Sequence, residues 1–149
     1  MGALKDRLAA EMKDAMKARD RVRLATLRLL TAAVKNREVA LGHELSDEEL
    51  QQVATTEVKR RKEAAEAYRQ GGATEREEAE RAEQAILETF LPEQLPEDEV
   101  AAVIDEAVAA TGASGPGDVG KVMGYVMGKV QGRADGGEVN RMVRERLGA

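Results

Sequence analysis

The sequence has 149 residues, of which 42% are hydrophobic and only 2% aromatic, a formal net charge of −5, and no cysteine. This length allows one ordinary domain or two small ones, the core must be aliphatic, and disulfide and thiolate chemistry are excluded. There is no apolar run long enough to span a membrane and no apolar signal core at the start, so we expect a cytoplasmic protein.

The charge is unevenly distributed along the chain. Residues 1–42 carry a net charge of +5, residues 43–115 a net charge of −12, and residues 116–149 a net charge of +2. This division predicts two positive surfaces separated by a repulsive one. Charged helix faces that meet only solvent would give the same pattern.

Two helices are expected in the first 42 residues. The first has apolar residues four apart on one face: Leu4, Leu8, Met12 and Met16. Asp20 is placed to cap the second, which ends near Leu41 because Gly42 follows. The second helix carries Leu24, Leu27, Thr31 and Val34 on one face.

Two capping-box patterns predict the next two helices. Ser46 is followed three residues later by Glu49, which opens a third helix that ends at Gly71-Gly72. Thr74 is followed by Glu77 in the same way and opens a fourth helix.

The fourth helix is expected to run through Phe90, because the residue before Pro92 is pushed out of the helical region. The segment Pro92–Pro96 has the composition of a short stiff linker. We therefore predict an N-terminal four-helix region over residues 1–92 and a C-terminal helical module over residues 97–149.

Three more helices are expected in the C-terminal module. One spans about Glu97 to Thr111, a glycine-rich one follows the turn at Pro116 and runs to about Val130, and Asp135 caps the last. No strand pattern of period two is present. The expected fold is all-α, an N-terminal antiparallel helical bundle followed by a small three-helix module.

Five glycines near the C-terminus fall four residues apart, although each costs a helix about 1 kcal/mol relative to alanine. They are Gly120, Gly124, Gly128, Gly132 and Gly136. At about 100° per residue, the Val and Met side chains of this helix share one arc, and the glycines lie on the other side beside Lys121 and Lys129.

Three explanations of the glycines remain open. Bare backbone beside lysines would let an RNA phosphate backbone approach closely. A neighbouring helix of the same chain could pack there instead, or the glycines could simply fray the helix.

The sequence offers no credible active site and no motif for a metal or cofactor. His43 is the single histidine, and neither Ser46 nor Ser114 has a visible base. The Gly-Lys pairs lack the spacing and the Ser/Thr of a P-loop.

A second basic feature lies in the second helix. Arg21, Arg28 and Lys35 are seven residues apart on one stripe, which either meets solvent or contributes to binding. Because aromatic residues are scarce, single-strand base stacking is disfavoured. A folded or double-helical RNA suits the composition better.

Several motifs together resemble the GatB/YqeY family over nearly the whole chain. They are densest in Asp118–Gly124, Gly132–Gly136 and Val139-Asn140, and they extend to Ile86-Leu87, Phe90–Pro92, Gln94-Leu95, Leu27-Arg28 and Asp47–Glu49. The chain is similar to the stand-alone, YqeY-like member. Relatives of that member include the C-terminal tail domain of the B subunit of the tRNA-dependent amidotransferase, which converts mischarged glutamate or aspartate on tRNA to the amide.

The resemblance implies an all-helical fold whose C-terminal module can engage tRNA, and it does not imply catalysis by this chain alone. We expect no cofactor. The positions carried over are Gly120, Lys121, Gly124, Lys129, Gly132 and Arg133. Carbon–nitrogen ligase activity would arise only within a complex, because the catalytic portion of the amidotransferase subunit is absent. A protein-interaction module that docks on an amidotransferase or an aminoacyl-tRNA synthetase is the alternative. Gly128 stands where the family often has proline.

Overall fold

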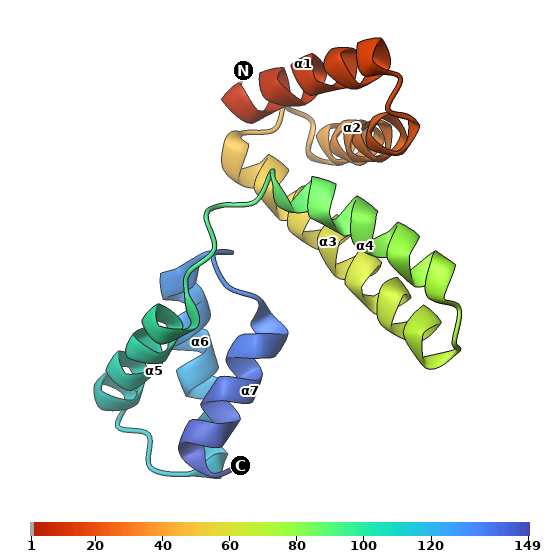
Figure 1. Ribbon diagram of the computed structural model, residues 1–149. Coiled ribbons are helices and arrows are strands. Elements are labelled where there is room, and N and C mark those ends of the chain that lie inside the picture. Colours follow the sequence, from red (N-terminus) through yellow and green to blue (C-terminus); the bar gives the residue numbers. More distant parts are fainter. Residues whose placement is uncertain (1) are drawn as a thin grey trace. The chain divides into compact units, whose positions relative to one another are not determined.

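The computed structural model describes residues 2–149, and all regular secondary structure in them is helical (Figure 1). This confirms the all-α prediction. None of the helices over residues 2–149 combines the length and apolar character needed to cross a membrane. The chain divides into two compact units, Met1–Leu91 and Pro92–Ala149, which are described separately below.

The N-terminal unit consists of two helical hairpins. Its helices are α1 (Ala3–Ala18), α2 (Arg21–Leu41), α3 (Asp47–Gln70) and α4 (Thr74–Glu88). The hairpin of α1 and α2 lies across one end of the longer hairpin formed by α3 and α4 (Figure 1).

Local capping signals position α2 and α3 as expected. The Asp20 carboxylate accepts a hydrogen bond from the Arg23 backbone N–H, and Gly42 ends α2 in the left-handed region with φ +77°. Ser46 and Glu49 form both hydrogen bonds of the capping box at the start of α3. The hydrogen bonds of Asp20 and of the capping box satisfy backbone N–H groups that the start of a helix leaves free.

The predicted capping box at Thr74 is wrong. Ala73 is the N-cap of α4, without a side-chain cap, and Thr74 is already the first helical residue. The backbone N–H of Glu77 therefore bonds the Ala73 carbonyl, and the Glu77 side chain pairs with Arg81 at 3.0 Å. The helix ends at Glu88 rather than Phe90, because the next N–H groups bond three residues back in a tighter turn.

One apolar cluster holds the N-terminal unit together. It includes Leu27, Leu30, Leu50, Leu87 and Phe90, each at most 1% exposed. The cluster takes residues of α3 only as far as Val58. Farther along, charged groups link α3 to α4, with the Arg61 Nε 3.3 Å from a Glu83 carboxylate oxygen.

The C-terminal unit contains α5 (Glu97–Thr111), a short 3₁₀ helix (Pro116–Asp118), α6 (Val119–Val130) and α7 (Gly136–Leu147). Its core is aliphatic, as the composition requires: Val100, Ile104, Ala107, Val122, Val126, Val130, Val139, Val143 and Leu147. Asp135 caps α7 by accepting from the Glu138 N–H, as predicted.

The Pro92–Pro96 segment, expected to be a linker, is bonded to the turn between α6 and α7. The Leu95 N–H donates to the Arg133 carbonyl at 2.7 Å. The Gln94 side-chain amide donates to the Gly132 carbonyl at 3.0 Å.

Candidate nucleic-acid interface

Helix α6 presents two different faces. Val122, Val126 and Val130 are buried, and Val119, Met123 and Met127 pack against the same core. The predicted Val/Met arc is therefore confirmed as the inward face of α6. The opposite face carries the glycines and the two lysines.

The glycines on α6 face open space. At Gly120, Gly124 and Gly128, the position that a Cβ would occupy has no heavy atom of the C-terminal unit within 4 Å, apart from chain neighbours and the backbone of α6 itself. Within this unit, then, no neighbouring helix packs on the glycine arc. The helix is also continuous from Val119 to Val130, so bare helical backbone is available over about three turns.

The last two glycines of the series do not belong to α6. Gln131 ends the helix in the left-handed conformation, and Gly132 follows with φ +82°, a region that glycine adopts without strain. Gly136 is the first residue of α7 and lies 3.7 Å from the Met127 methyl group, measured from its ideal Cβ. The five evenly spaced glycines therefore lie in three different backbone environments: helix α6, the turn that follows it, and the start of α7.

Lys121 is exposed but paired at the start of α6. Its Nζ lies 3.1 Å from a carboxylate oxygen of Asp118. The Ser114 backbone N–H also donates to Asp118 at 2.9 Å. The Ser114 hydrogen bond, followed by Lys121, lowers the pKa of the Asp118 carboxyl below its ordinary value.

Lys129 joins a small cluster between α5 and α6. Its Nζ lies 3.4 Å from Glu106 and 5.8 Å from the centre of the Tyr125 ring. The Tyr125 hydroxyl donates to the same Glu106 oxygen at 2.7 Å. That hydrogen bond, and then Lys129, lowers the pKa of the Glu106 carboxyl. The same hydrogen bond raises the pKa of the Tyr125 hydroxyl, against the opposing effect of Lys129.

Arg133 lies outside α6 and contacts the Pro92–Pro96 segment. Its Nε donates to the Glu93 carbonyl at 3.0 Å, and its own carbonyl accepts from the Leu95 N–H. The structure thus groups Gly120, Lys121, Gly124 and Lys129 on one helix, whereas Gly132 and Arg133 shape the turn that follows.

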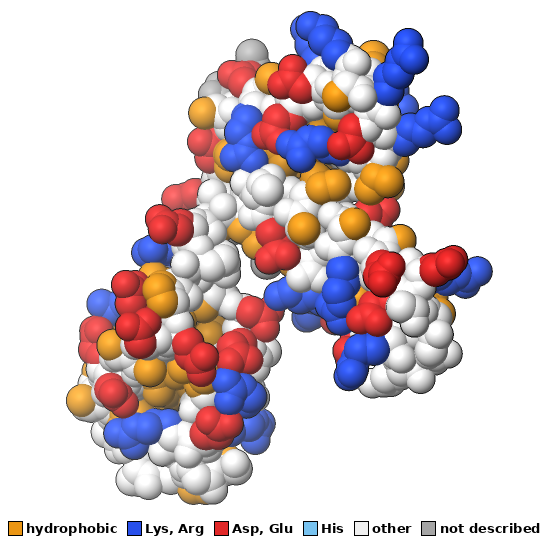
Figure 2. Space-filling model, viewed as in Figure 1, with side chains coloured by type: hydrophobic (Ala, Val, Ile, Leu, Met, Phe, Trp, Pro, Cys, Tyr) orange, Lys and Arg blue, Asp and Glu red, His pale blue; other side chains and the backbone are white. Residues whose placement is uncertain are grey.

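The charges around the candidate face are mixed. Residues 92–149 contain six basic and ten acidic side chains, a net charge of −4. Figure 2 shows the two signs interspersed over this unit. Sequence reasoning identified the lysines but not their partners Asp118 and Glu106, because that pairing depends on loop geometry and on how α5 packs against α6.

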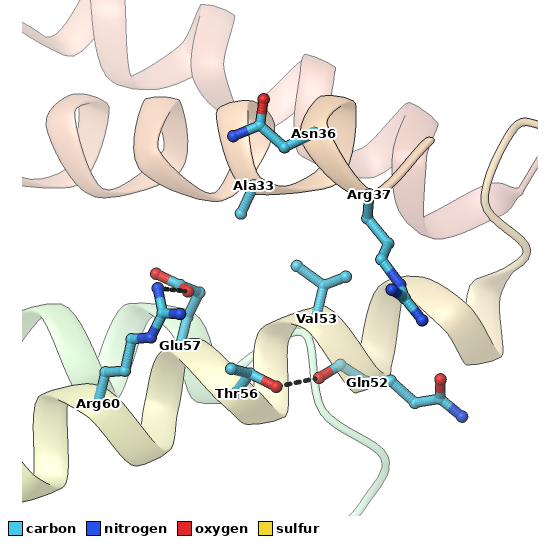
Figure 3. Close-up of a pocket in the computed structure, with 8 residues that line it drawn as sticks. All are labelled: Ala33, Asn36, Arg37, Gln52, Val53, Thr56, Glu57 and Arg60. Atoms are coloured by element: carbon cyan, nitrogen blue, oxygen red, sulfur yellow. Dashed lines mark hydrogen bonds and ion pairs between the residues drawn. The ribbon is translucent and has the colours of Figure 1, made fainter. Parts of the chain in front are cut away.

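A groove of about 460 Å³ lies between α2 and α3 (Figure 3). Ala33 and Val53 contribute apolar surface, and Arg37 and Arg60 contribute charge. Glu57 is the buried acid of this groove and pairs with Arg60 at 3.0 Å. No cluster of three or more His, Cys, Asp or Glu residues suited to a metal ion occurs among residues 2–149.

A family model described as Yqey-like protein matches residues 5–147. This match spans nearly the whole chain and confirms the family resemblance seen in the sequence motifs. No curated protein matches the chain.

Proposed function

The chain belongs to the YqeY family, and we propose that it is a non-catalytic, cytoplasmic tRNA-binding accessory protein. The observation that carries the proposal is the exposed backbone of Gly120, Gly124 and Gly128 beside Lys121 and Lys129 on α6. Phosphate contacts need cations and close backbone approach rather than a deep pocket.

The ion pairs of the two lysines are compatible with RNA contact. The Lys121 and Lys129 side chains are 51% and 55% exposed. Ion pairs at such exposed sites contribute about 0–1 kcal/mol. A phosphate can therefore replace Asp118 or Glu106 as the partner at small cost, and the release of counterions from the RNA favours the exchange.

A filter-retention assay with purified tRNA tests the assignment. Replacement of both lysines, Lys121→Ala with Lys129→Ala, is expected to lower tRNA affinity by about tenfold at low salt. The matched control is Lys13→Ala with Lys17→Ala, which removes the same charge from exposed positions on α1 and is expected to retain affinity. Equal affinities of the parent and the α6 variant would refute the site.

A protein-interaction module remains the second candidate, because exposed apolar and cationic side chains gather on α2. A pulldown of an amidotransferase or a synthetase that survives nuclease treatment, by a chain without affinity for purified tRNA, would favour it. Carbon–nitrogen ligase activity within a complex is the third, and product from Glu-tRNA, glutamine and ATP would support it.

A further inference from the structure

Over residues 2–149, no other element covers the outward face of α2, and the residues on this face follow a heptad pattern. Taking Val22 as position a, the a and d positions fall on Val22, Ala25, Leu29, Ala32, Asn36 and Val39. All six are exposed, with Val22 at 54%, Leu29 at 46% and Val39 at 83%. Apolar residues at a and d form the contact seam of two supercoiled helices. We call this set the α2 seam.

The α2 seam gathers exposed hydrophobic surface that is rare elsewhere in the chain. Over residues 2–149, the large hydrophobic side chains that are exposed all lie between Met16 and Leu41. Three of these five belong to the seam. Burial of such side chains is favourable by about 25 cal/mol per Å² of apolar area, so a partner that covers the face would gain free energy.

The positions that flank the seam on one side are all cationic. Arg21, Arg28 and Lys35 occupy the three g positions, and each is exposed. Within the described chain, these three side chains have no ion pair or hydrogen bond. The single acid of α2, Glu38, points elsewhere and pairs with Lys5 at 2.7 Å.

We propose that the α2 seam docks an acidic amphipathic helix of a partner protein. Carboxylates on that helix would pair with Arg21, Arg28 and Lys35, because g positions meet the e or g positions of the opposite helix. Its apolar residues would cover Val22, Leu29 and Val39. Asn36 is a polar a position, which fixes register in such pairs, so the partner carries a polar residue opposite it.

The charge and the apolar surface of α2 together favour an acidic partner helix over two other occupants, a second copy of this chain and a nucleic acid. Antiparallel pairing with the α2 of a second copy would oppose the three cations to one another. Parallel pairing would set them against Thr26, Ala33 and Ala40, which carry no charge. A nucleic acid would use the cations but leave the exposed Val and Leu side chains uncovered.

The groove of Figure 3 borders the α2 seam and extends the docking surface. Ala33 lies at an e position and Asn36 at an a position, and both line the groove with Val53 of α3. A helix on the seam would therefore also meet α3 along one side.

The probe is a fluorescent three-heptad peptide, the length of the 21-residue α2. It has Leu at a and d, Asn opposite Asn36, and Glu at e and g, whose mutual repulsion limits self-pairing. Anisotropy with the full chain is expected to show binding, and a peptide with Lys at e and g is expected not to bind. Arg28→Gln with Lys35→Gln, and separately Leu29→Gln, are each expected to weaken binding about fivefold or more.

Matched variants test whether peptide binding depends on the seam itself or only on the positive charge and exposed apolar surface of the unit. Lys13→Gln with Lys17→Gln removes equal charge from α1, and Met16→Gln removes an exposed apolar side chain outside the seam; both are expected to bind the peptide within twofold of the parent. No binding of the acidic peptide, or equal weakening by the control variants, would overturn the proposal. If Arg28→Gln with Lys35→Gln loses tRNA retention but still binds the peptide, the occupant of the seam is RNA instead. If the parent is a dimer that Leu29→Gln dissociates, the occupant is a second copy of this chain.

Discussion

Gly124 lies in the middle of α6, where alanine would fit. Its backbone is helical, and the position of a Cβ there is free of neighbours within 4 Å in the C-terminal unit. No contact within this unit requires glycine at position 124. Glycine nevertheless destabilises a helix interior by about 1 kcal/mol relative to alanine. A requirement for close approach by a ligand would account for the residue.

The variant Gly124→Ala separates stability from binding. We expect the free energy of unfolding to rise by about 1 kcal/mol in denaturant titrations, while tRNA affinity falls because the added methyl group holds phosphates away from the backbone. A less stable variant would show that the glycine serves the fold. A stabilised variant with unchanged tRNA affinity would exclude close backbone approach at this position.

Glu80 lies in the polar interface between α3 and α4. Burial, and then the neighbouring Glu83, raises the pKa of the Glu80 carboxyl above its ordinary value of 4.5, against the opposing effect of Arg61. One of its carboxylate oxygens is buried without a hydrogen bond. The folded state thus binds the Glu80 proton more tightly than the unfolded state does, and the ionised group destabilises the fold at neutral pH.

We therefore expect Glu80→Gln to be more stable than the parent at pH 7. The difference should shrink as the pH falls through the raised pKa and below 4.5, because the parent carboxyl is then protonated in both states. Denaturant titrations at pH 7 and pH 4 measure it. Glu78→Gln, at an exposed position of the same helix, controls for the loss of charge. A difference that grows on acidification would contradict this account.

At the scale of the helices, local signals predicted most boundaries. Asp20, Gly42, Ser46 and Asp135 act at the helix ends where they were expected, because capping involves residues only a few positions apart. The capping box predicted at Thr74 was wrong because α4 begins one residue earlier than expected, with Ala73 as its N-cap after the turn at Gly71-Gly72.

The candidate face on α6 was predictable only in part. Helical periodicity alone separated the glycines and lysines from the Val/Met core face. The contact of Lys129 with Glu106 and Tyr125 depends on the packing of α5 against α6, and periodicity carries no information about it. The role of Arg133 in holding the Glu93–Leu95 backbone was missed for the same reason.

Beyond Val58, α3 lies outside the large apolar cluster of the unit, and Ala65 is the buried apolar side chain of α3 there. The buried apolar cluster of the unit stops at Val58 on α3, and polar pairs such as Arg69 with Glu66 and Arg81 with Glu77 follow. Exposed pairs of this kind contribute little to stability.

Amide hydrogen exchange is therefore expected to be faster near the Gly71-Gly72 turn, over residues 64–80, than at Leu27 and Leu30 of α2. The cause is local opening of the hairpin end, whose free energy lies below that of global unfolding. Exchange measured by NMR on the full chain tests this. Equal protection along all four helices of the unit would contradict it.

At the scale of the whole molecule, the two proposed surfaces lie in different units. The α6 face combines bare backbone with two lysines, whereas the α2 seam is apolar apart from Asn36 and is flanked by three cations. Each surface has a distinct ligand chemistry, so the tRNA proposal and the partner-helix proposal can fail independently.

The salt dependence of tRNA binding tests the central claim most directly. Each lysine that contacts a phosphate contributes about one unit to the slope of log K against log salt concentration. We predict that Lys121→Ala with Lys129→Ala lowers the magnitude of that slope by about two relative to the parent, and that Lys13→Ala with Lys17→Ala leaves it unchanged. An unchanged slope in the α6 variant, or an equal loss in the α1 variant, would contradict tRNA contact through α6.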